Sequence, residues 1–259
     1  MKLARIALAR MWWACAGVLL THAASAAPDL SGVYNIAGGF GPAANTLGDL
    51  KPLNPNHGAE ATKHLQPWAR AKMEASAQYS AIDDNGAICG PTSFFRHPTT
   101  VVGYMVLQTA DRVYLVSEDM SQVGVRRVYL NQPHPRNLRP SWNGHSIGHW
   151  EGDTLVVDTI GFNDKSWLGS ELQPHTEELH VVERIRTVKE GAFLEIHSTI
   201  DDRKALTGAY SYSRYYKRTD QEFESVDSSC NPEINDQQMW VYMRQQAIEQ
   251  FEKNRKAAQ

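Results

Sequence analysis

The sequence has few cysteines, no long apolar segment and no surplus of basic residues, and each shortage excludes a class of protein. Three cysteines in 259 residues are too few for a small scaffold held together by disulfides. The most apolar stretch, residues 11–20, is shorter than the ~20 residues that a membrane-spanning helix needs. Acidic residues outnumber basic ones, 29 to 26, so neither nucleic acid nor an anionic membrane surface is an expected partner.

Motifs for common cofactors are missing as well. The chain contains no phosphate-binding loop, no glycine fingerprint for a dinucleotide and no haem attachment motif. It also contains no internal repeat, linker or low-complexity segment, so a single domain is expected. No cofactor is therefore predicted, and a divalent metal enters only as an alternative that is considered below.

The first 26 residues have the three parts of a secretory signal peptide. A positive start, an apolar stretch and a small-residue cleavage site follow one another: Lys2, Arg5 and Arg10, then residues 11–20, then Ala24-Ser25-Ala26. We predict that residues 1–26 are removed and that 27–259 form one β-rich domain with flanking helices, periplasmic or secreted. Three of the 26 basic and none of the 29 acidic residues are lost, so the net charge falls from −3 to about −6.

Two cysteines, Cys89 and Cys230, remain after the signal peptide is removed. An even number of cysteines in an oxidising compartment predicts one disulfide. Closing so long a loop contributes up to ~5 kcal/mol in the loop-entropy model. Two buried free thiols are the alternative.

Most of the chain consists of short segments rich in β-branched and aromatic residues, separated by turns. The expected strands cover residues 30–36, 101–109, 113–117, 124–130, 147–150, 154–162, 178–188, 192–201 and 210–217. Gly152 and Gly191 mark tight turns between neighbouring strands. This pattern predicts a mainly β fold, namely an antiparallel up-and-down barrel or strongly curled, lipocalin-like sheet. A two-sheet sandwich is the alternative.

Helices are expected at both ends of the domain. Residues 60–79 favour a helix, and Pro67 should break it or mark its true first turn. Residues 235–256 form an amphipathic pattern whose apolar side is available to cover an end or an edge of the barrel.

Two segments in the middle of the chain are distinctive. Residues 142–164 read WNGHSIGHWEGDTLVVDTIGFND, and residues 174–184 read PHTEELHVVER. Together they resemble the signature of a family of secreted, largely uncharacterised bacterial proteins that carry GHSxGxWEGDTLVVDTxGFND followed by PHxExLHVxER. The resemblance covers roughly residues 85–235 and implies export but no particular activity. His149 stands where the family usually has arginine, so no family role is expected for it.

The two segments concentrate titratable side chains. A histidine with a carboxylate partner can act as general acid or base near neutral pH, and an arginine can hold an anionic group. The candidate catalytic residues are His145, His175, Glu177, His180 and Arg184. His180 and Arg184 fall on the same face of the predicted strand, and Glu177 is near enough in sequence to orient His180. We expect these side chains to converge on one pocket.

Aromatic residues near these segments offer a binding surface. Trp142, Asp158 and Tyr212 are the candidate substrate-binding residues, in a region rich in tryptophan and tyrosine. Such aromatic residues also form ordinary cores and cross-strand pairs. The leading hypothesis is a periplasmic lyase, hydratase or isomerase that acts on a small, fairly apolar, aromatic or steroid-like molecule.

Three other interpretations stay open. The first is a non-catalytic carrier of a small ligand, whose cavity should be apolar with the histidines and glutamates outside it. The second is a metal-dependent hydrolase or oxygenase, with His145, His175, His180 and Glu177 or Asp158 as ligands, although no recognised ligand spacing is present. The third is purely structural, with the imidazoles bonded to loop backbone. Ser146 in Gly-His-Ser-Ile-Gly is a weak nucleophile candidate, because its context is β-structure throughout.

Overall fold

The computed structural model describes residues 27–37, 47–88, 91–96, 103–117, 124–221 and 237–257. The predicted signal peptide and both cysteines of the predicted disulfide lie outside these residues. Where helices are described, none is long and apolar enough to cross a membrane.

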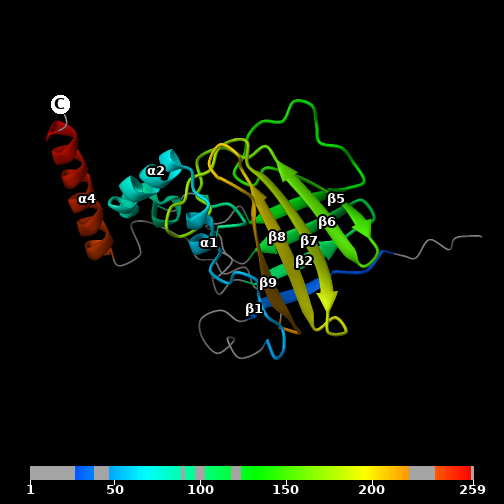
Figure 1. Cartoon of the computed structure of the whole chain (residues 1–259). Helices are drawn as coiled ribbons and strands as arrows, with labels where there is room; N and C mark the ends of the chain where they lie inside the picture. The colour runs from blue at the N-terminus through cyan, green and yellow to red at the C-terminus, as the bar shows by residue number, and fades with distance from the viewer. Residues whose placement is uncertain are drawn as a thin grey trace, which may run out of the picture.

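Within the described residues, nine strands in chain order form one closed barrel (Figure 1). The strands are β1 Gly32–Ala37, β2 Tyr104–Gln108, β3 Arg112–Ser117, β4 Val125–Leu130, β5 His145–Glu151, β6 Thr154–Ile160, β7 His180–Val188, β8 Phe193–Asp201 and β9 Tyr210–Thr219. The last strand pairs with the first, which closes the barrel. The predicted mainly β barrel is therefore confirmed, and the chain does not form the alternative sandwich.

One pair of strands departs from the up-and-down pattern. β4 and β5 are parallel, with Val128 opposite Ser146, whereas the other neighbouring pairs are antiparallel. Parallel neighbours need a long crossover, because a tight hairpin can join only antiparallel strands. The crossover is the segment 131–144, which is rich in proline and is followed by β5. This segment brings additional side chains over the barrel wall.

The strands alternate between an inward and an outward face. In β8, Leu194, Ile196, Ser198 and Ile200 are buried while the residues between them are more exposed. The period of two places every second side chain inside the barrel. Leucine, isoleucine and valine side chains from several strands fill one end of the interior, together with Tyr34 and Tyr216.

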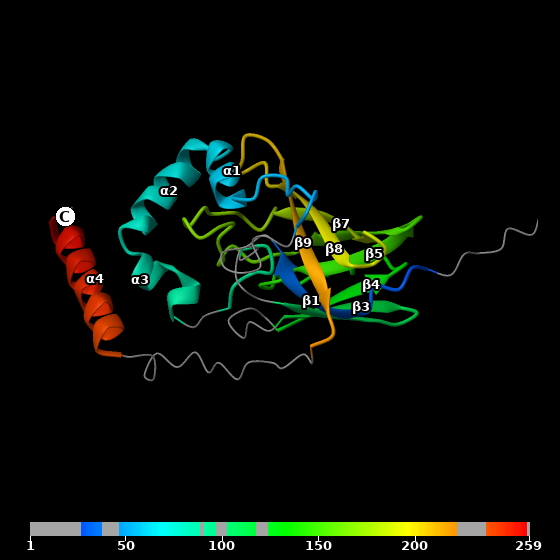
Figure 2. The same cartoon turned by 90° about the horizontal axis from the view of Figure 1, so that it is seen from below.

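The helices lie at one end of the barrel and beyond it (Figures 1 and 2). They are α1 His57–Lys63, α2 Pro67–Ala77, α3 Ser80–Asp83, the 3-10 turn η2 Asn85–Ile88, and α4 Gln237–Ala257. As expected, the helix predicted over 60–79 is interrupted at Pro67, which stands in the first turn of α2. Asn56 caps α1, its side chain accepting the backbone N–H of Ala59 at 3.1 Å.

A second apolar cluster joins α1 and α2 to the barrel. It includes Ala61, Leu65 and Ala69 of the helical region, and Ile200 and Tyr210 of the strands. The helical region near the N-terminus therefore covers this end of the barrel. The C-terminal helix α4 does not take that position. It packs against α3, and Phe251 meets the ring of Tyr79 edge-on at 5.4 Å.

Candidate functional site

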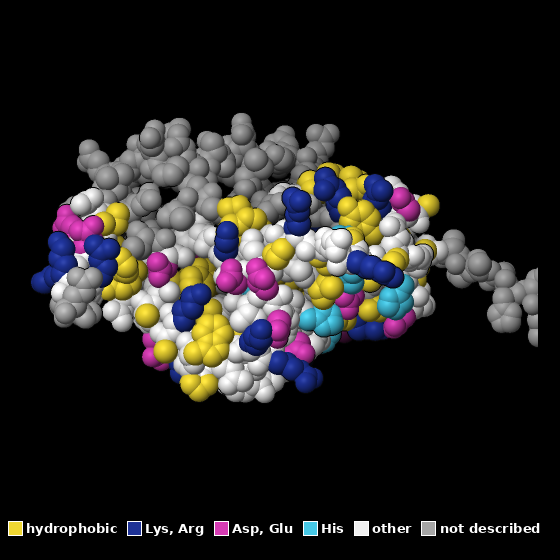
Figure 3. Space-filling model, turned by 90° about the horizontal axis from the view of Figure 1, so that it is seen from above, with side chains coloured by type: hydrophobic (Ala, Val, Ile, Leu, Met, Phe, Trp, Pro, Cys, Tyr) yellow, Lys and Arg dark blue, Asp and Glu magenta, His cyan; other side chains and the backbone are white. Residues whose placement is uncertain are grey.

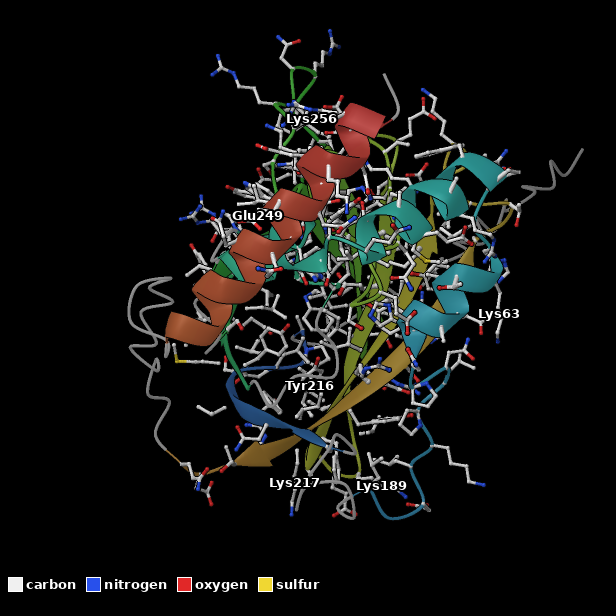
Figure 4. All side chains as sticks on the ribbon, turned by 90° about the vertical axis from the view of Figure 1, so that its left-hand side faces the viewer. Lys63, Lys189, Tyr216, Lys217, Glu249 and Lys256 are labelled. Atoms are coloured by element: carbon white, nitrogen blue, oxygen red, sulfur yellow. The ribbon has the colours of Figure 1, made fainter. Side chains whose placement is uncertain are left out.

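The first candidate site is a polar layer inside the barrel, between the two apolar clusters. Arg126 of β4, Glu183 of β7 and Arg214 of β9 all point inward and are at most 6% exposed. Each has the same strand parity as buried apolar neighbours, for example Arg126 with Val128 and Leu130. Figure 4 shows this alternation at the end of β9, where Tyr216 lies inside the ring of strands and Lys217 points away from it.

Arg126 is the centre of the polar layer. Its guanidinium forms an ion pair with Glu183, and it donates to the hydroxyls of Ser146 at 3.1 Å and Thr159 at 2.9 Å. The ring of Phe94 covers it, with 3.6 Å between the guanidinium carbon and the ring centre. A buried charge is tolerated when it is paired and hydrogen-bonded in this way.

Arg214 is the second buried guanidinium. It donates to the backbone carbonyls of Ser213 at 3.0 Å and Pro55 at 2.7 Å, and it lies 5.1 Å from the Tyr212 ring centre. Burial lowers the pKa of Arg214. Even so, an arginine with an ordinary pKa above 12 stays charged.

Three tyrosines complete the layer. Burial raises the pKa of Tyr212 to about 12. Burial also raises the pKa values of Tyr104 and Tyr216 well above that of an ordinary tyrosine. All three phenols are therefore neutral hydrogen-bond donors at neutral pH.

These side chains surround a small cavity of about 30 Å³. Charged, hydroxyl, amide and apolar groups share its lining: Arg126, Arg214, Glu183, Ser117, Ser198, Asn143, Tyr104, Tyr212, Tyr216, Phe94, Leu115 and Ile196. One water needs ~10–15 Å³ on this measure, so the cavity has room for about two waters or the two oxygens of a carboxylate. It is far smaller than the ~300 Å³ typical of a pocket for a drug-sized ligand.

The second candidate site is a chain of hydrogen-bonded side chains on the outer face of the barrel. His134, from the crossover, lies between His145 of β5 and Asp158 of β6. Its Nδ1 is 2.9 Å from Nδ1 of His145, and its Nε2 is 2.9 Å from Oδ1 of Asp158. The other carboxylate oxygen of Asp158 is 2.7 Å from Nε2 of His180 on β7. Histidine side chains are visible on the barrel surface in Figure 3.

The surroundings of these hydrogen-bonded side chains shift their pKa values in opposite directions. Hydrogen bonds from His180 and His134 lower the pKa of Asp158, although burial opposes them. The hydrogen bond to Asp158 raises the pKa of His180. Burial, together with the neighbouring His134, lowers the pKa of His145. At neutral pH Asp158 is therefore a carboxylate and His145 is a neutral imidazole.

The structure brings together only part of the set that the sequence singled out. His145, Asp158 and His180 share the outer chain, while Trp142 lies beside His145 along the wall of a surface hollow. Tyr212 lies on the other side of the wall, inside the barrel.

His175 is remote from these outer histidines, because its ring packs against the second apolar cluster. It is 2% exposed, packs edge-on against Phe95 and bonds to the Ser166 hydroxyl at 2.8 Å and the Thr176 carbonyl at 3.0 Å. The carbonyl can only accept, so Nδ1 carries the proton and Nε2 accepts from Ser166. These contacts support a structural role for His175.

Two further expectations need correction. Glu177 is exposed, and Asp158 is the carboxylate that orients His180. Asp158 lies opposite Val182 on the neighbouring strand and reaches His180 diagonally, at 2.7 Å. Arg184 does share the outer face with His180, but its side chain is about half exposed and donates to Glu151 at 2.9 Å. The residues expected to share one pocket thus lie in three places: the outer face of the barrel, the second apolar cluster and the solvent-exposed surface.

Four contributors to the two sites were missed from the sequence: His134, Arg126, Glu183 and Arg214. A signal existed for the last three, because each is a charged residue at the buried parity of an apolar strand. For metal, the described residues contain no group of three or more His, Cys, Asp or Glu side chains arranged to hold an ion. His134 and His145 are the described pair whose ring nitrogens face each other.

No protein-family model matches the chain, and no curated protein matches its sequence. Among solved structures, the REP1-NXSQ fatty acid transporter is similar over 75% of this chain and 98% of its own, with 10% identity and a TM-score of 0.36. A secretary abundant heat soluble (SAHS) protein from Ramazzottius varieornatus is similar over 73% of this chain and 94% of its own, with 11% identity and a TM-score of 0.35. Similarity at this level supports no inference about ligand or activity.

Proposed function

We propose that this protein is a small-ligand-binding barrel that holds an anionic group of its ligand in the interior polar layer, and that this interior site binds without chemical turnover. The observation that carries the proposal is the interior cavity, which is lined by two guanidinium groups and one carboxylate. The volume of about 30 Å³ fits a carboxylate rather than a whole drug-sized molecule. The apolar remainder of such a ligand would lie toward the half-buried Phe94 ring.

The lining is suited to recognise negative charge. Arginine presents a planar fork of donors that matches a carboxylate, and such charge-assisted bonds are about twice as strong as neutral ones. The tyrosines around the cavity add neutral O–H donors, because their pKa values are raised. Glu183 bonds to Arg126, whereas Arg214 donates to the carbonyls of Ser213 and Pro55 at the wall of the cavity. We assign Arg214 and the phenols to the ligand.

Binding is favoured over turnover by the position of the histidines. No histidine is among the described residues that line the interior cavity. General acid/base chemistry near neutral pH most often uses histidine, and a base must be within hydrogen-bond reach of its substrate. The arrangement therefore agrees better with a carrier than with the lyase, hydratase or isomerase of the leading sequence hypothesis. Export to the periplasm, as the N-terminus predicts, would make the ligand an extracytoplasmic one.

The test is isothermal titration with matched ligand pairs, benzoate with benzyl alcohol and octanoate with octanol. The carboxylates should bind and the alcohols should bind at least tenfold more weakly. Arg214→Gln should weaken carboxylate binding roughly 10- to 100-fold, the equivalent of a charged hydrogen bond of about 1.5–3 kcal/mol. Lys217→Gln is the matched control, because Lys217 is an exposed cation on β9, three residues after Arg214.

Arg214 also bonds to backbone, so a second variant guards against simple unfolding. Tyr216→Phe removes only one donor and should weaken carboxylate binding several-fold, with an unchanged melting temperature in the absence of ligand. Equal affinity for acid and alcohol, or full affinity in both variants, would refute the proposed anionic site.

A further inference from the structure

The outer chain of His134, His145, Asp158 and His180 has a defined order of donors and acceptors. Asp158 is a carboxylate and can only accept, so Nε2 of His134 and Nε2 of His180 must each donate a proton to it. With a single proton on the His134 ring, the other nitrogen, Nδ1, then carries the lone pair. The hydrogen bond between the two rings therefore requires His145 to donate from its own Nδ1.

This order of donors and acceptors places Nε2 of His145 at one end of the hydrogen-bonded series. With the proton on Nδ1, the Nε2 nitrogen of neutral His145 carries a lone pair. No hydrogen bond joins this atom to any residue that the structure describes. The ring is held in place by stacking on Tyr129, with ring centres 5.0 Å apart and planes within 6°. An oriented imidazole with a free lone pair is the arrangement that a general base requires.

A surface hollow of about 260 Å³ adjoins this ring. His145 and Tyr129 form part of its wall, together with Trp142, Asn143 and Arg127. The Arg127 side chain is exposed, and no ion pair joins it to a described carboxylate. The hollow thus combines a base, an aromatic ring, an amide and a cation, which is the set expected of a site for a small molecule.

We propose that the outer face carries a second site, in which Nε2 of His145 is a general base toward a small molecule with an anionic group and an acidic O–H or C–H. The anionic group binds Arg127, and the substrate's acidic proton passes to Nε2. The electron pair of the broken bond stays on the substrate. The positive charge on His145 is shared through its Nδ1–H with His134, whose Nε2–H remains bonded to the Asp158 carboxylate.

The roles within the chain differ. His145 is the residue that touches the reacting atoms, while His134 and Asp158 are positioning residues that fix its tautomer. His180 bonds to the second oxygen of Asp158 and lies outside the relay. The hollow and the interior cavity share Arg126 and Asn143 in their walls. The inference does not depend on the interior cavity, because His145 and Arg127, which carry it, lie on the outward face of their strands.

The experiment measures acylation of individual histidines by diethyl pyrocarbonate, resolved by peptide mass spectrometry. The reagent reacts with a neutral imidazole lone pair: a bond forms from nitrogen to the carbonyl carbon, and ethyl carbonate leaves, giving ethanol and carbon dioxide. His149 is the internal control, because it is well exposed and lies on the same face of β5. His145 should react at least as fast as His149 despite its greater burial.

Variants separate the relay from a structural role. Asp158→Ala should slow acylation of His145 by about tenfold, a small share of the ~10²–10⁴ typical of a positioned base, whereas His180→Ala should change it less than twofold. Nitrogen-15 NMR should show His145 protonated at Nδ1 in the native protein and mixed tautomers in Asp158→Ala.

Three results would overturn the proposal. The first is a proton on Nε2 of His145 in the native protein, and the second is an acylation rate that Asp158→Ala leaves unchanged. The third is protection of both His134 and His145 by micromolar Zn²⁺, which would make the two facing nitrogens a metal-ligand pair instead of a relay.

Discussion

Arg126 and Arg127 are neighbours on β4, yet they belong to different chemical regions of the molecule. Arg126 points into the barrel, where Glu183, two hydroxyls and an aromatic ring surround it. Arg127 points outward, beside the histidine chain. Inside, charge is stable only while every partner is present, because desolvation is costly. Outside, water can replace a lost partner, so the histidines and the carboxylate there are able to titrate and to react.

The largest predicted effect tests the interior. Glu183→Ala should lower the free energy of unfolding by about 3–5 kcal/mol, because Arg126 would remain buried without its carboxylate. Urea denaturation followed by tryptophan fluorescence measures it. The double variant Arg126→Met, Glu183→Leu should recover most of that stability. A loss below about 1 kcal/mol for Glu183→Ala would show that the interior is as well hydrated as the surface.

Packing of the inner wall gives the next largest effect. A Cβ on Gly148 would lie 2.8 Å from Cγ1 of Val128 and 3.2 Å from Cδ1 of Leu155. Gly148→Ala should therefore cost about 1–3 kcal/mol through overpacking, measured by the same denaturation. Gly124→Ala is the control, since a Cβ on Gly124 would meet no described atom within 4 Å. Similar costs for both variants would contradict a tightly packed interior.

A smaller, pH-dependent effect tests the outer chain. His180 has a raised pKa, so its stabilising contribution is complete below the pKa of the unfolded ring and is lost as pH rises through the folded value. Asp158 has a lowered pKa, so its contribution is present above its unfolded pKa and is lost as pH falls.

His180→Ala should consequently cost most between about pH 4 and pH 6.5, the ordinary carboxyl and imidazole pKa values. The cost there should be at most about 1 kcal/mol, because the pair is partly exposed. Thermal or urea denaturation at pH 5 and pH 8.5 provides the comparison. A larger cost at pH 8.5 would reverse the predicted sign.

The smallest effect is expected for a histidine outside the chain. His149 is well exposed and pairs with Glu151 at 3.2 Å. His149→Arg should change the free energy of unfolding by no more than about 0.5 kcal/mol, as is usual for surface sites. It should also leave acylation of His145 unaltered. A marked loss in either measurement would place His149 in the outer site.

Much of the barrel could be predicted because strand parity is a local property of the sequence. The alternation of apolar and polar side chains in residues 194–200 agrees with the buried and more exposed positions of β8, and Pro67 marks the first turn of α2. The parallel pairing of β4 with β5 could not be predicted. It depends on where the proline-rich crossover runs, and a loop sequence does not encode the strand that it rejoins.

The sites were predicted only in part, because the position of a residue on a strand follows from the period of two, whereas the position of a loop residue does not. His145, Asp158 and His180 lie on neighbouring strands, and the period of two places them on one face. His134 reaches them only through the crossover, so its sequence position gave no indication. His175 has the composition of a site residue, and only its burial among aromatic rings reveals a different role.

The closure of the barrel has a consequence for how the chain assembles. β1 pairs with β2 on one side and with β9 on the other, so Tyr34 faces Tyr104 and also Arg218, far along the sequence. Contacts between such distant residues form slowly, because the intervening chain must be ordered first. Until β1 is in place, β2 and β9 present open edges that can pair with another chain. By pairing with both edges, β1 prevents strand exchange between copies. A protein without β1 would be prone to aggregate through the open edges of β2 and β9.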